Sequence, residues 1–238
     1  MIQRKIAPMT ASRALGLLPP VLAAAALILL LASGPGHRLG LWDYRVALSV
    51  LRAAAYVGFA AAGASLLFLL VARLRRSGWK LFVAAFVAGA CAAAVPLQFQ
   101  RQARAVPPIN DISTDTADPP RFLEGRPYAG AETAARQREA YPDLQPAVLA
   151  LPQQAAFEKA LAAARAQGWE IVRADPAGGR IEATATTPWF GFKDDVAIRV
   201  LPAGTTGSRV DVRSKSRVGR GDAGANAARI RRFLAAVK

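Results

Sequence analysis

Three long apolar runs dominate the first hundred residues, and no charged side chain interrupts any of them. The runs cover residues 14–33, 53–72 and 81–100. A helix needs about 20 such residues to cross the hydrocarbon core of a bilayer, and these runs are too long for buried strands and show no strand-type alternation. The pattern therefore predicts a transmembrane region over residues 1–100, with three helices near these positions.

The first run carries a double proline, Pro19 and Pro20. Because proline lacks a backbone donor, this run also fits the apolar core of a signal peptide that is cleaved near Gly34. The sequence leaves open whether the segment is a retained helix or a cleaved signal.

Basic residues beside the apolar runs predict how the chain crosses the membrane. Seven Lys or Arg lie before the first run or between the second and third runs, and five flank the opposite ends. This bias places the N-terminus in the cytoplasm. We therefore expect a multi-pass protein of a bacterial cytoplasmic (inner) membrane, with residues 101–238 in the periplasm or outside the cell.

Small residues are frequent in the second and third runs, among them Gly58, Gly63 and Gly89. Such residues let helices approach closely, but an alanine-rich composition alone gives the same pattern, and the oligomeric state stays open. No Asp, Glu, Lys or His lies at mid-span. Ion and proton pathways normally contain such a group, so a transporter is disfavoured.

Residues 101–151 show little periodicity and contain two Pro-Pro pairs, which favour extended chain. The stretch is predicted to be a Pro/Asp-rich linker with one short helix near residues 130–140. Its aspartates Asp111, Asp115 and Asp118 do not form a calcium loop of the EF-hand type, because such a loop needs acids at alternate positions around a central glycine.

Regular patterns return in residues 152–238. Helical spacing in LPQQAAFEKALAAARAQGW predicts a helix that ends at Gly168. The segments WEIVRAD, RIEATATT, DDVAIRVLP and SRVDVRSKSRV alternate as strands do, and an amphipathic run follows Asp222. The predicted fold is an α+β two-layer sandwich built from a helix, a four-stranded antiparallel sheet and a helix.

The register of the last two strands follows from their side chains. Placing Val200 opposite Val210 puts the apolar residues of both strands on one side, and a shift by one position would pair them with charged residues. The same register sets opposite charges across the ladder: Arg199 with Asp211 and Asp195 with Lys215.

The final helix is expected to begin at a cap formed by Asp222. Its apolar residues Ile230 and Leu234 should face the sheet, whereas Arg229 and Arg231 should cover the other faces.

Charge is distributed unevenly along the chain, which has a formal charge of +15. Residues 1–100 carry ten basic side chains and one acid, residues 101–208 are almost balanced, and residues 209–238 carry nine basic side chains and two acids. The single cysteine, Cys91, and the single histidine, His37, are too few for a disulfide, a zinc site or a Cys–His nucleophile pair. We expect no cofactor and no metal.

The motifs TPWFGFKDDVAIRV and VDVRSKSRVGRGDAGANAARI resemble the bacterial and plastid family called domain of unknown function 1499 (DUF1499). PPINDISTDTADPPRF is also similar to a segment of membrane-anchored members, although Asn110 stands where those often have histidine, which weakens any general-base role there. The resemblance covers about residues 105–238 and implies a fold and a membrane context without a known activity. The residues that match the pattern are Phe192, Asp194, Asp195, Arg213, Ser214, Ser216, Arg217, Gly219, Asp222, Gly224 and Asn226.

A binding or scaffold role without catalysis is the first functional hypothesis. Arginine forks and amides at a helix start suit phosphate or carboxylate, so the ligand would be a membrane-lipid headgroup, a cell-wall polymer or an acidic protein partner. The aromatic WFGF segment would enter the bilayer or line a pocket. In the alternative interpretation the acids only pair with the arginines, Asp222 only caps its helix and the aromatics are core. The candidate residues are Arg213, Ser214, Ser216, Arg217, Arg220, Asp194, Asp195, Asp222 and Asn226.

A membrane-bound enzyme of unknown reaction that uses Asp194 and Asp222 with Arg217 is the second hypothesis. Asp194 and Asp195 themselves should point to opposite faces of a strand, so they make a poor pair for acid–base work. Nucleic-acid binding is disfavoured, because few aromatics interleave the basic residues, no nucleic-acid motif is present and the expected compartment is wrong.

Overall fold

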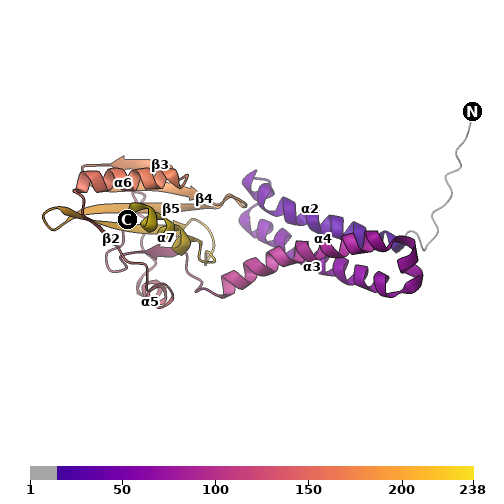
Figure 1. Cartoon of the computed structure of the whole chain (residues 1–238). Helices are drawn as coiled ribbons and strands as arrows, with labels where there is room; N and C mark the ends of the chain where they lie inside the picture. Colours follow the sequence, from indigo (N-terminus) through magenta and orange to yellow (C-terminus); the bar gives the residue numbers. More distant parts are fainter. Residues whose placement is uncertain (1–14) are drawn as a thin grey trace, which may run out of the picture. The chain divides into compact units, whose positions relative to one another are not determined.

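The computed structural model of the chain describes residues 15–238 and divides into two compact units, residues 1–100 and 101–238 (Figure 1). The first unit consists of helices α2 (Leu18–Arg38), α3 (Tyr44–Leu70) and α4 (Ala72–Arg104). Within the described residues, three helices are long and apolar enough to cross a membrane, and the third begins at Gly78, where the backbone of α4 leaves helical geometry. The three predicted helices are confirmed, and they are compatible with membrane insertion.

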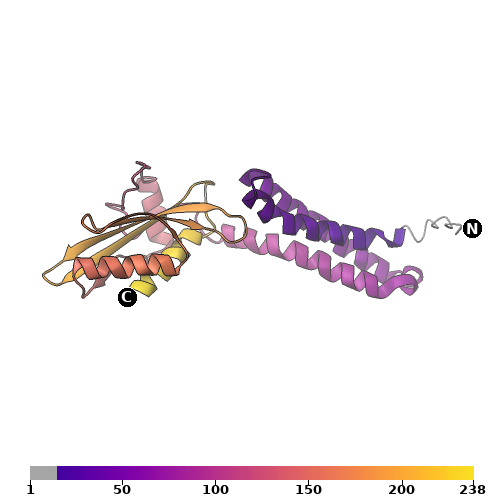
Figure 2. The same cartoon turned by 90° about the horizontal axis from the view of Figure 1, so that it is seen from above.

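Helices α3 and α4 meet through two glycines, and Figure 2 shows the helices of this unit side by side. A Cβ atom on Gly58 would lie 2.6 Å from the carbonyl oxygen of Gly89, and one on Gly89 would lie 2.7 Å from the carbonyl oxygen of Gly58. Real side chains do not approach backbone so closely, so both positions need glycine for helix packing. A Cβ on Gly63 would meet no atom of the described residues within 4 Å, so helix packing there does not require glycine.

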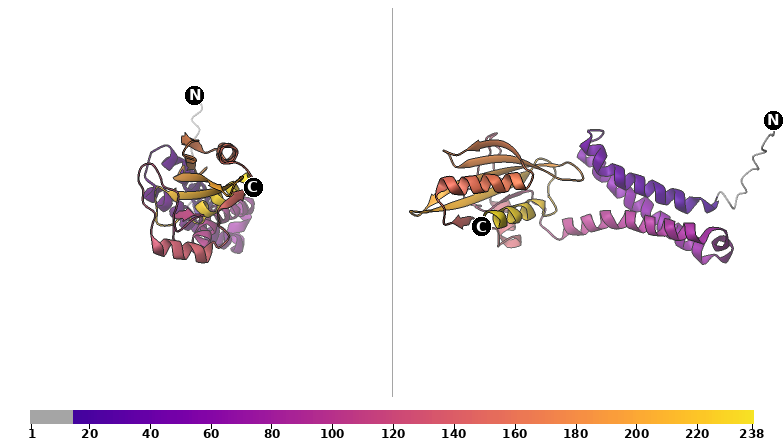
Figure 3. Two further views of the ribbon diagram at one scale, coloured as in Figure 1. Left: turned by 90° about the vertical axis from the view of Figure 1, so that its left-hand side faces the viewer. Right: turned by 45° about the horizontal axis from the view of Figure 1, so that its top comes forward.

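The second unit is an antiparallel sheet with helices. Its strands are ordered β1-β6-β5-β4-β3. Strand β2 pairs with the same edge of β6 as β1 does, nearer the start of β6. Helices α6 and α7 pack on one face of the sheet (Figure 3). The elements in chain order are β1 (Asp111–Ser113), α5 (Ala131–Ala140), β2 (Ala147–Leu149), α6 (Gln153–Ala166), β3 (Glu170–Asp175), β4 (Arg180–Thr186), β5 (Lys193–Ala203), β6 (Gly207–Ser216) and α7 (Ala225–Val237).

The sheet has six strands, so the predicted four-stranded sheet is wrong. The two additional strands, β1 and β2, come from residues 101–151, the stretch that was expected to be a linker. Each contains three residues, which is too short to show an alternating pattern, and both are held by pairing with β6. The short helix expected near residues 130–140 is confirmed as α5.

The register predicted for the last two strands is confirmed. Val200 pairs with Val210, and Arg199 and Asp195 lie opposite Asp211 and Lys215. The apolar residues of the strands face α6 and α7 in one core, where Trp169 stacks on Phe233 of α7 at 5.4 Å between ring centroids. We call this the inner face of the sheet, and the opposite one the outer face.

Helix α7 departs from expectation at one position. Ile230 and Leu234 are buried against the sheet as predicted, but Arg229 is also buried, with 6 % of its surface exposed. The prediction that Arg229 covers a solvent face is wrong, because its guanidinium binds the buried carboxylate of Asp194.

Candidate functional site

Arg213 of β6 is the largest fully buried side chain of the domain, and it points to the outer face of the sheet. Its Nε and Nη2 atoms donate to the two carboxylate oxygens of Asp111 at 2.8 and 2.9 Å. Asp111 comes from β1 and has no exposed surface. A bidentate arginine–carboxylate pair of this kind is among the strongest polar contacts in proteins.

Arg213 also donates to the backbone of the stretch that covers it. Its donors reach the carbonyl oxygens of Pro120 at 3.2 Å and Pro127 at 2.9 Å. The rings of Phe122 and Tyr128 lie 4.6 and 5.3 Å from the guanidinium carbon. Arg213 therefore anchors the chain between residues 120 and 128 over the outer face, and with 2 % of its surface exposed it is closed to a ligand from solvent.

Tyr128 shows that the stretch anchored by Arg213 is closed to water. Burial, with the nearby charge of Asp111, raises the pKa of the Tyr128 hydroxyl to about 12. That hydroxyl is buried without a hydrogen-bond partner among the described residues.

A second polar cluster lies on the inner face, at the start of α7. The side-chain oxygen of the fully buried Asn226 accepts hydrogen bonds from Ser214 at 2.7 Å and from Arg229. Its amide nitrogen donates to Ser216 at 3.0 Å and to the carbonyl oxygen of Asn110 at 3.1 Å. Asn226 thus ties β6, α7 and the entering chain together, which is a structural role.

Asp194 completes this cluster from β5. Its carboxylate accepts from Nη2 of Arg229 at 2.5 Å, and both side chains are buried. Removing either partner would leave an unpaired buried charge, so the pair fixes α7 to the sheet.

Asp222 lies two residues before Gly224, the N-cap of α7, and binds the first turn of the helix as expected. Its carboxylate oxygens accept from the backbone amides of Gly224 and Asn226, each at 2.8 Å. Burial raises the pKa of the Asp222 carboxyl, and the charge of Asp194 raises it further, although the two amide hydrogen bonds act in the opposite direction.

Asp195 points to the outer face, away from Asp194. Arg217 donates to it at 2.9 and 2.7 Å and also reaches Thr184 at 3.1 Å. Arg126 lies 2.8 Å from the other carboxylate oxygen without hydrogen-bond alignment, so this contact is an ion pair only. The two adjacent aspartates are therefore separated by the sheet and do not share a site.

The loop between β6 and α7 carries the exposed candidates. The side chain of Arg217 is 44 % exposed despite its contact with Asp195. Arg220 is exposed, and within the described part of the chain it makes no hydrogen bond or ion pair. Gly219 has a left-handed φ of 85°, a conformation that favours glycine, and this turn presents Arg220 to solvent.

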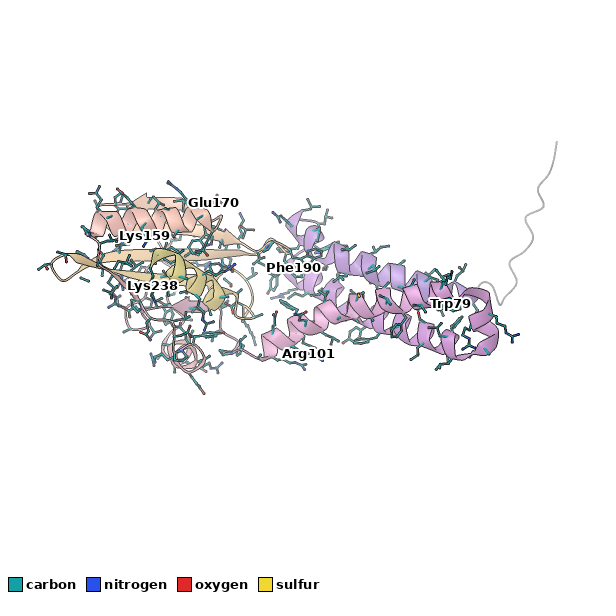
Figure 4. The ribbon with its side chains drawn as sticks, viewed as in Figure 1. Trp79, Arg101, Lys159, Glu170, Phe190 and Lys238 are labelled. Carbon is teal, nitrogen blue, oxygen red and sulfur yellow. The ribbon has the colours of Figure 1, made fainter. Side chains whose placement is uncertain are left out.

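An aromatic loop lies beside this basic loop. The backbone amide of Arg217 donates to the carbonyl oxygen of Lys193 at 3.1 Å, which joins the β6–α7 loop to the end of the β4–β5 loop. In that loop Phe190, labelled in Figure 4, is buried and stacks on Phe192 at 4.9 Å. Trp189 is 43 % exposed.

The chain enters the domain at the same place. The amide of Ser216 donates to the carbonyl oxygen of Asn110 at 2.9 Å, and Nδ2 of Asn110 donates to the carbonyl oxygen of Gly219 at 2.6 Å. Five residues separate Asn110 from Arg104, the last residue of α4.

A comparison with protein families shows which family the chain belongs to. Residues 111–237 match the family described as protein of unknown function (DUF1499). The chain belongs to the DUF1499 family. No curated protein matches the chain.

The DUF1499 match begins at the first residue of β1 and ends at the last residue of α7. It therefore includes the covering stretch and Asp111, the partner of Arg213. Among the described residues of the DUF1499 protein, no group of three His, Cys, Asp or Glu side chains is arranged to hold a metal ion.

Four residues of the two clusters were missed from the sequence: Asp111, Asn110, Arg126 and Arg229. One signal for Arg229 was available, because it follows Asn226 by three positions and so lies on the same helix face. Asn110 and Asp111 lie in the segment that resembles the family, but nothing in the sequence marked their contacts or Arg126, because the partners on β5 and β6 lie far away in the chain.

Proposed function

We propose that this protein is a non-catalytic membrane protein of the bacterial envelope whose DUF1499 domain binds an anionic group, specifically the headgroups of anionic lipids. The supporting observation is that Arg217 and Arg220 are the exposed cations among the nine candidate residues, and that their loop is hydrogen-bonded at Arg217 to the end of the β4–β5 loop, which carries the exposed Trp189. Tryptophan and arginine together suit the interface between water and a bilayer.

The path of the chain supports a lipid ligand over a soluble one. The loop with Arg217 and Arg220 is hydrogen-bonded to Asn110, which follows the last apolar helix by six residues. A headgroup of the same bilayer is therefore the anion available at the highest effective concentration. Each basic residue near an anionic surface contributes about 1 kcal/mol.

Amide hydrogen exchange of the full chain tests this proposal. The chain is placed in nanodiscs of phosphatidylcholine alone or mixed with phosphatidylglycerol, and exchange is followed in residues 216–224. We expect slower exchange with phosphatidylglycerol, and loss of this difference in the double variant Arg217→Gln/Arg220→Gln. The matched control is Arg165→Gln on α6, an exposed arginine on another surface, which should keep the difference. Identical exchange in both kinds of disc would refute lipid binding at this loop and leave an acidic protein partner as the alternative.

The orientation of the domain is part of the proposal. We infer that the chain lies in the cytoplasmic membrane with its DUF1499 domain outside the cytoplasm, from the seven basic residues on one side of the apolar runs against five on the other. Phosphatase and fluorescent-protein fusions to the C-terminus measure this, and fluorescence with an inactive phosphatase would reverse it.

The second candidate is a membrane-bound enzyme that uses Asp194 and Asp222 with Arg217. The raised pKa of the Asp222 carboxyl favours it, because catalytic acids often have such shifts. However, Asp194 is bound to Arg229, and Arg217 binds Asp195 on the other face of the sheet. Asp194 is near enough to Asp222 to raise its pKa, but its charge is neutralised by Arg229 and Arg217 lies on the other face of the sheet, so the binding role is the better supported one.

A further inference from the structure

Most arginines on the outer face of β5 and β6 are matched with aspartates. Arg199 binds Asp118 at 2.6 Å and Asp211 at 3.1 Å. Arg209 binds Asp115 at 2.7 Å and Asp211 at 3.0 Å. Arg213 and Arg217 are paired in the same way, as described above. This face therefore contains a network in which each of these cations has a carboxylate.

Three arginines near the other edge of the sheet are different. Arg121 comes from the stretch that covers the outer face, Arg173 from β3 and Arg180 from β4. All three are exposed, and within the described residues none makes a hydrogen bond or an ion pair. They line one hollow of about 480 Å³, a size within the usual range for small-molecule sites.

Each of the three acids that line this hollow accepts a hydrogen bond from another group. Asp118 binds Arg199, and Asp175 accepts from the amide of Gly178 at 3.0 Å. Glu182 accepts from the amide of Leu123 at 3.2 Å, and burial raises the pKa of the Glu182 carboxyl. Glu182 lies opposite Arg173 and Asp175 lies opposite Arg180 across the β3–β4 ladder, and the charge of Arg173 acts against the rise in the pKa of the Glu182 carboxyl. Among the described residues, however, Arg121, Arg173 and Arg180 form no ion pair within 4 Å and no hydrogen bond, so their guanidinium donors remain available to a ligand.

The hollow also has an apolar rim. Pro120, Phe122 and Leu123 line it from the covering stretch, and Leu123 is 52 % exposed. An apolar surface beside several arginines suits an anion that carries an organic group, because the guanidinium fork binds phosphate oxygens and the rim removes apolar area from water.

We propose that this hollow binds a small organic phosphate monoester, with the phosphate held by Arg121, Arg173 and Arg180 and the organic part against Leu123. The site is distinct from the lipid-contact loop, because Arg180 is the first residue of β4 whereas Trp189 follows its last residue. The ester can be the headgroup of a lysophosphatidic acid or a soluble metabolite, since both present a phosphate monoester.

Isothermal titration calorimetry of the full chain in phosphatidylcholine nanodiscs tests this site. The probes are glycerol 3-phosphate, a short-chain lysophosphatidic acid and inorganic phosphate. We expect at least one ester to bind more tightly than inorganic phosphate, and the affinity to fall about tenfold or more in Arg173→Gln/Arg180→Gln. Tighter binding of the lysophosphatidic acid indicates a lipid source, and tighter binding of glycerol 3-phosphate indicates a soluble one.

The controls separate this site from the loop. Arg121→Gln, from the covering stretch, should also weaken binding, whereas Arg165→Gln and Arg220→Gln should leave the affinity unchanged. All these side chains are exposed, so the variants should fold, and unchanged amide exchange in α6 and α7 checks this. Absence of binding by both esters, equal affinity for inorganic phosphate, or equal affinity in wild type and Arg173→Gln/Arg180→Gln would overturn the proposal.

Discussion

Replacing Asp111 by asparagine removes the charge that neutralises Arg213. The pair is closed from water, since Asp111 has no exposed surface and Arg213 has 2 %. Lys215 also lies 3.1 Å from the Asp111 carboxylate. Breaking one side of a buried ion pair costs about 3–5 kcal/mol, because the remaining charge stays buried without a partner. Asparagine keeps one acceptor oxygen, so we expect the lower end, about 3 kcal/mol.

Thermal unfolding of the full chain in neutral detergent micelles measures this cost. Near-ultraviolet circular dichroism follows the domain through Trp169, which is buried and stacked on Phe233. For a domain of this size, about 3 kcal/mol lowers the melting temperature by roughly 10 °C.

Asp143→Asn provides the matched control. Asp143 also forms a two-bonded pair with an arginine, Arg231, at 2.6 and 2.7 Å, but the two side chains are 53 % and 44 % exposed. Exposed pairs contribute about 1 kcal/mol or less, so the melting temperature should change little. Equal small losses in both variants would refute the reasoning, and they would mean that Arg213 is free enough to serve a ligand.

Three further predictions follow from single contacts. Gly89→Val should lower the dodecyl sulfate fraction at which the helices unfold, because its side chain would meet the backbone of Gly58, whereas Gly63→Val has open space and should not. Asn226→Ala should destabilise the domain by about 3 kcal/mol in a urea titration, since it leaves several buried polar groups without partners. The raised pKa of Asp222 means that the folded state holds this proton more tightly than the unfolded state. The free energy of unfolding should therefore fall as pH rises from about 3.8 through the raised pKa, and urea titrations of Asp222→Asn at several pH values should lack that contribution.

The sequence predicted the long elements because their patterns are local. Strands β3 to β6 each contain at least six residues, enough for alternation to show, and the pairing of β5 with β6 followed from opposite charges across the ladder. Strand β1 reads Asp-Ile-Ser and is fully buried. Asp111 is inside because Arg213 binds it, and Ser113 because Gln137 of α5 bonds to its backbone. No local pattern encodes these contacts.

The candidate site was predicted as a group of residues but not as an arrangement. Ser214, Ser216, Asn226 and Asp194 do lie together, as a motif-rich strand and helix start suggest. Their partners decide whether they face a ligand or the core. Arg229 is 35 positions from Asp194 and binds its buried carboxylate, a contact that the pattern of neighbouring positions does not show.

The positive charge of the last thirty residues illustrates the same limit. That segment holds nine basic side chains and two acids, which resembles a binding surface. Five of its arginines nevertheless pair with aspartates that come from earlier in the chain. The net charge of a segment therefore overstates the charge available to a ligand. The cations available for binding are exposed arginines without an ion pair among the described residues, such as Arg220 in this segment and Arg173 and Arg180 elsewhere. The five pairs are Arg209 with Asp115, Arg213 with Asp111, Arg217 with Asp195, Arg229 with Asp194 and Arg231 with Asp143.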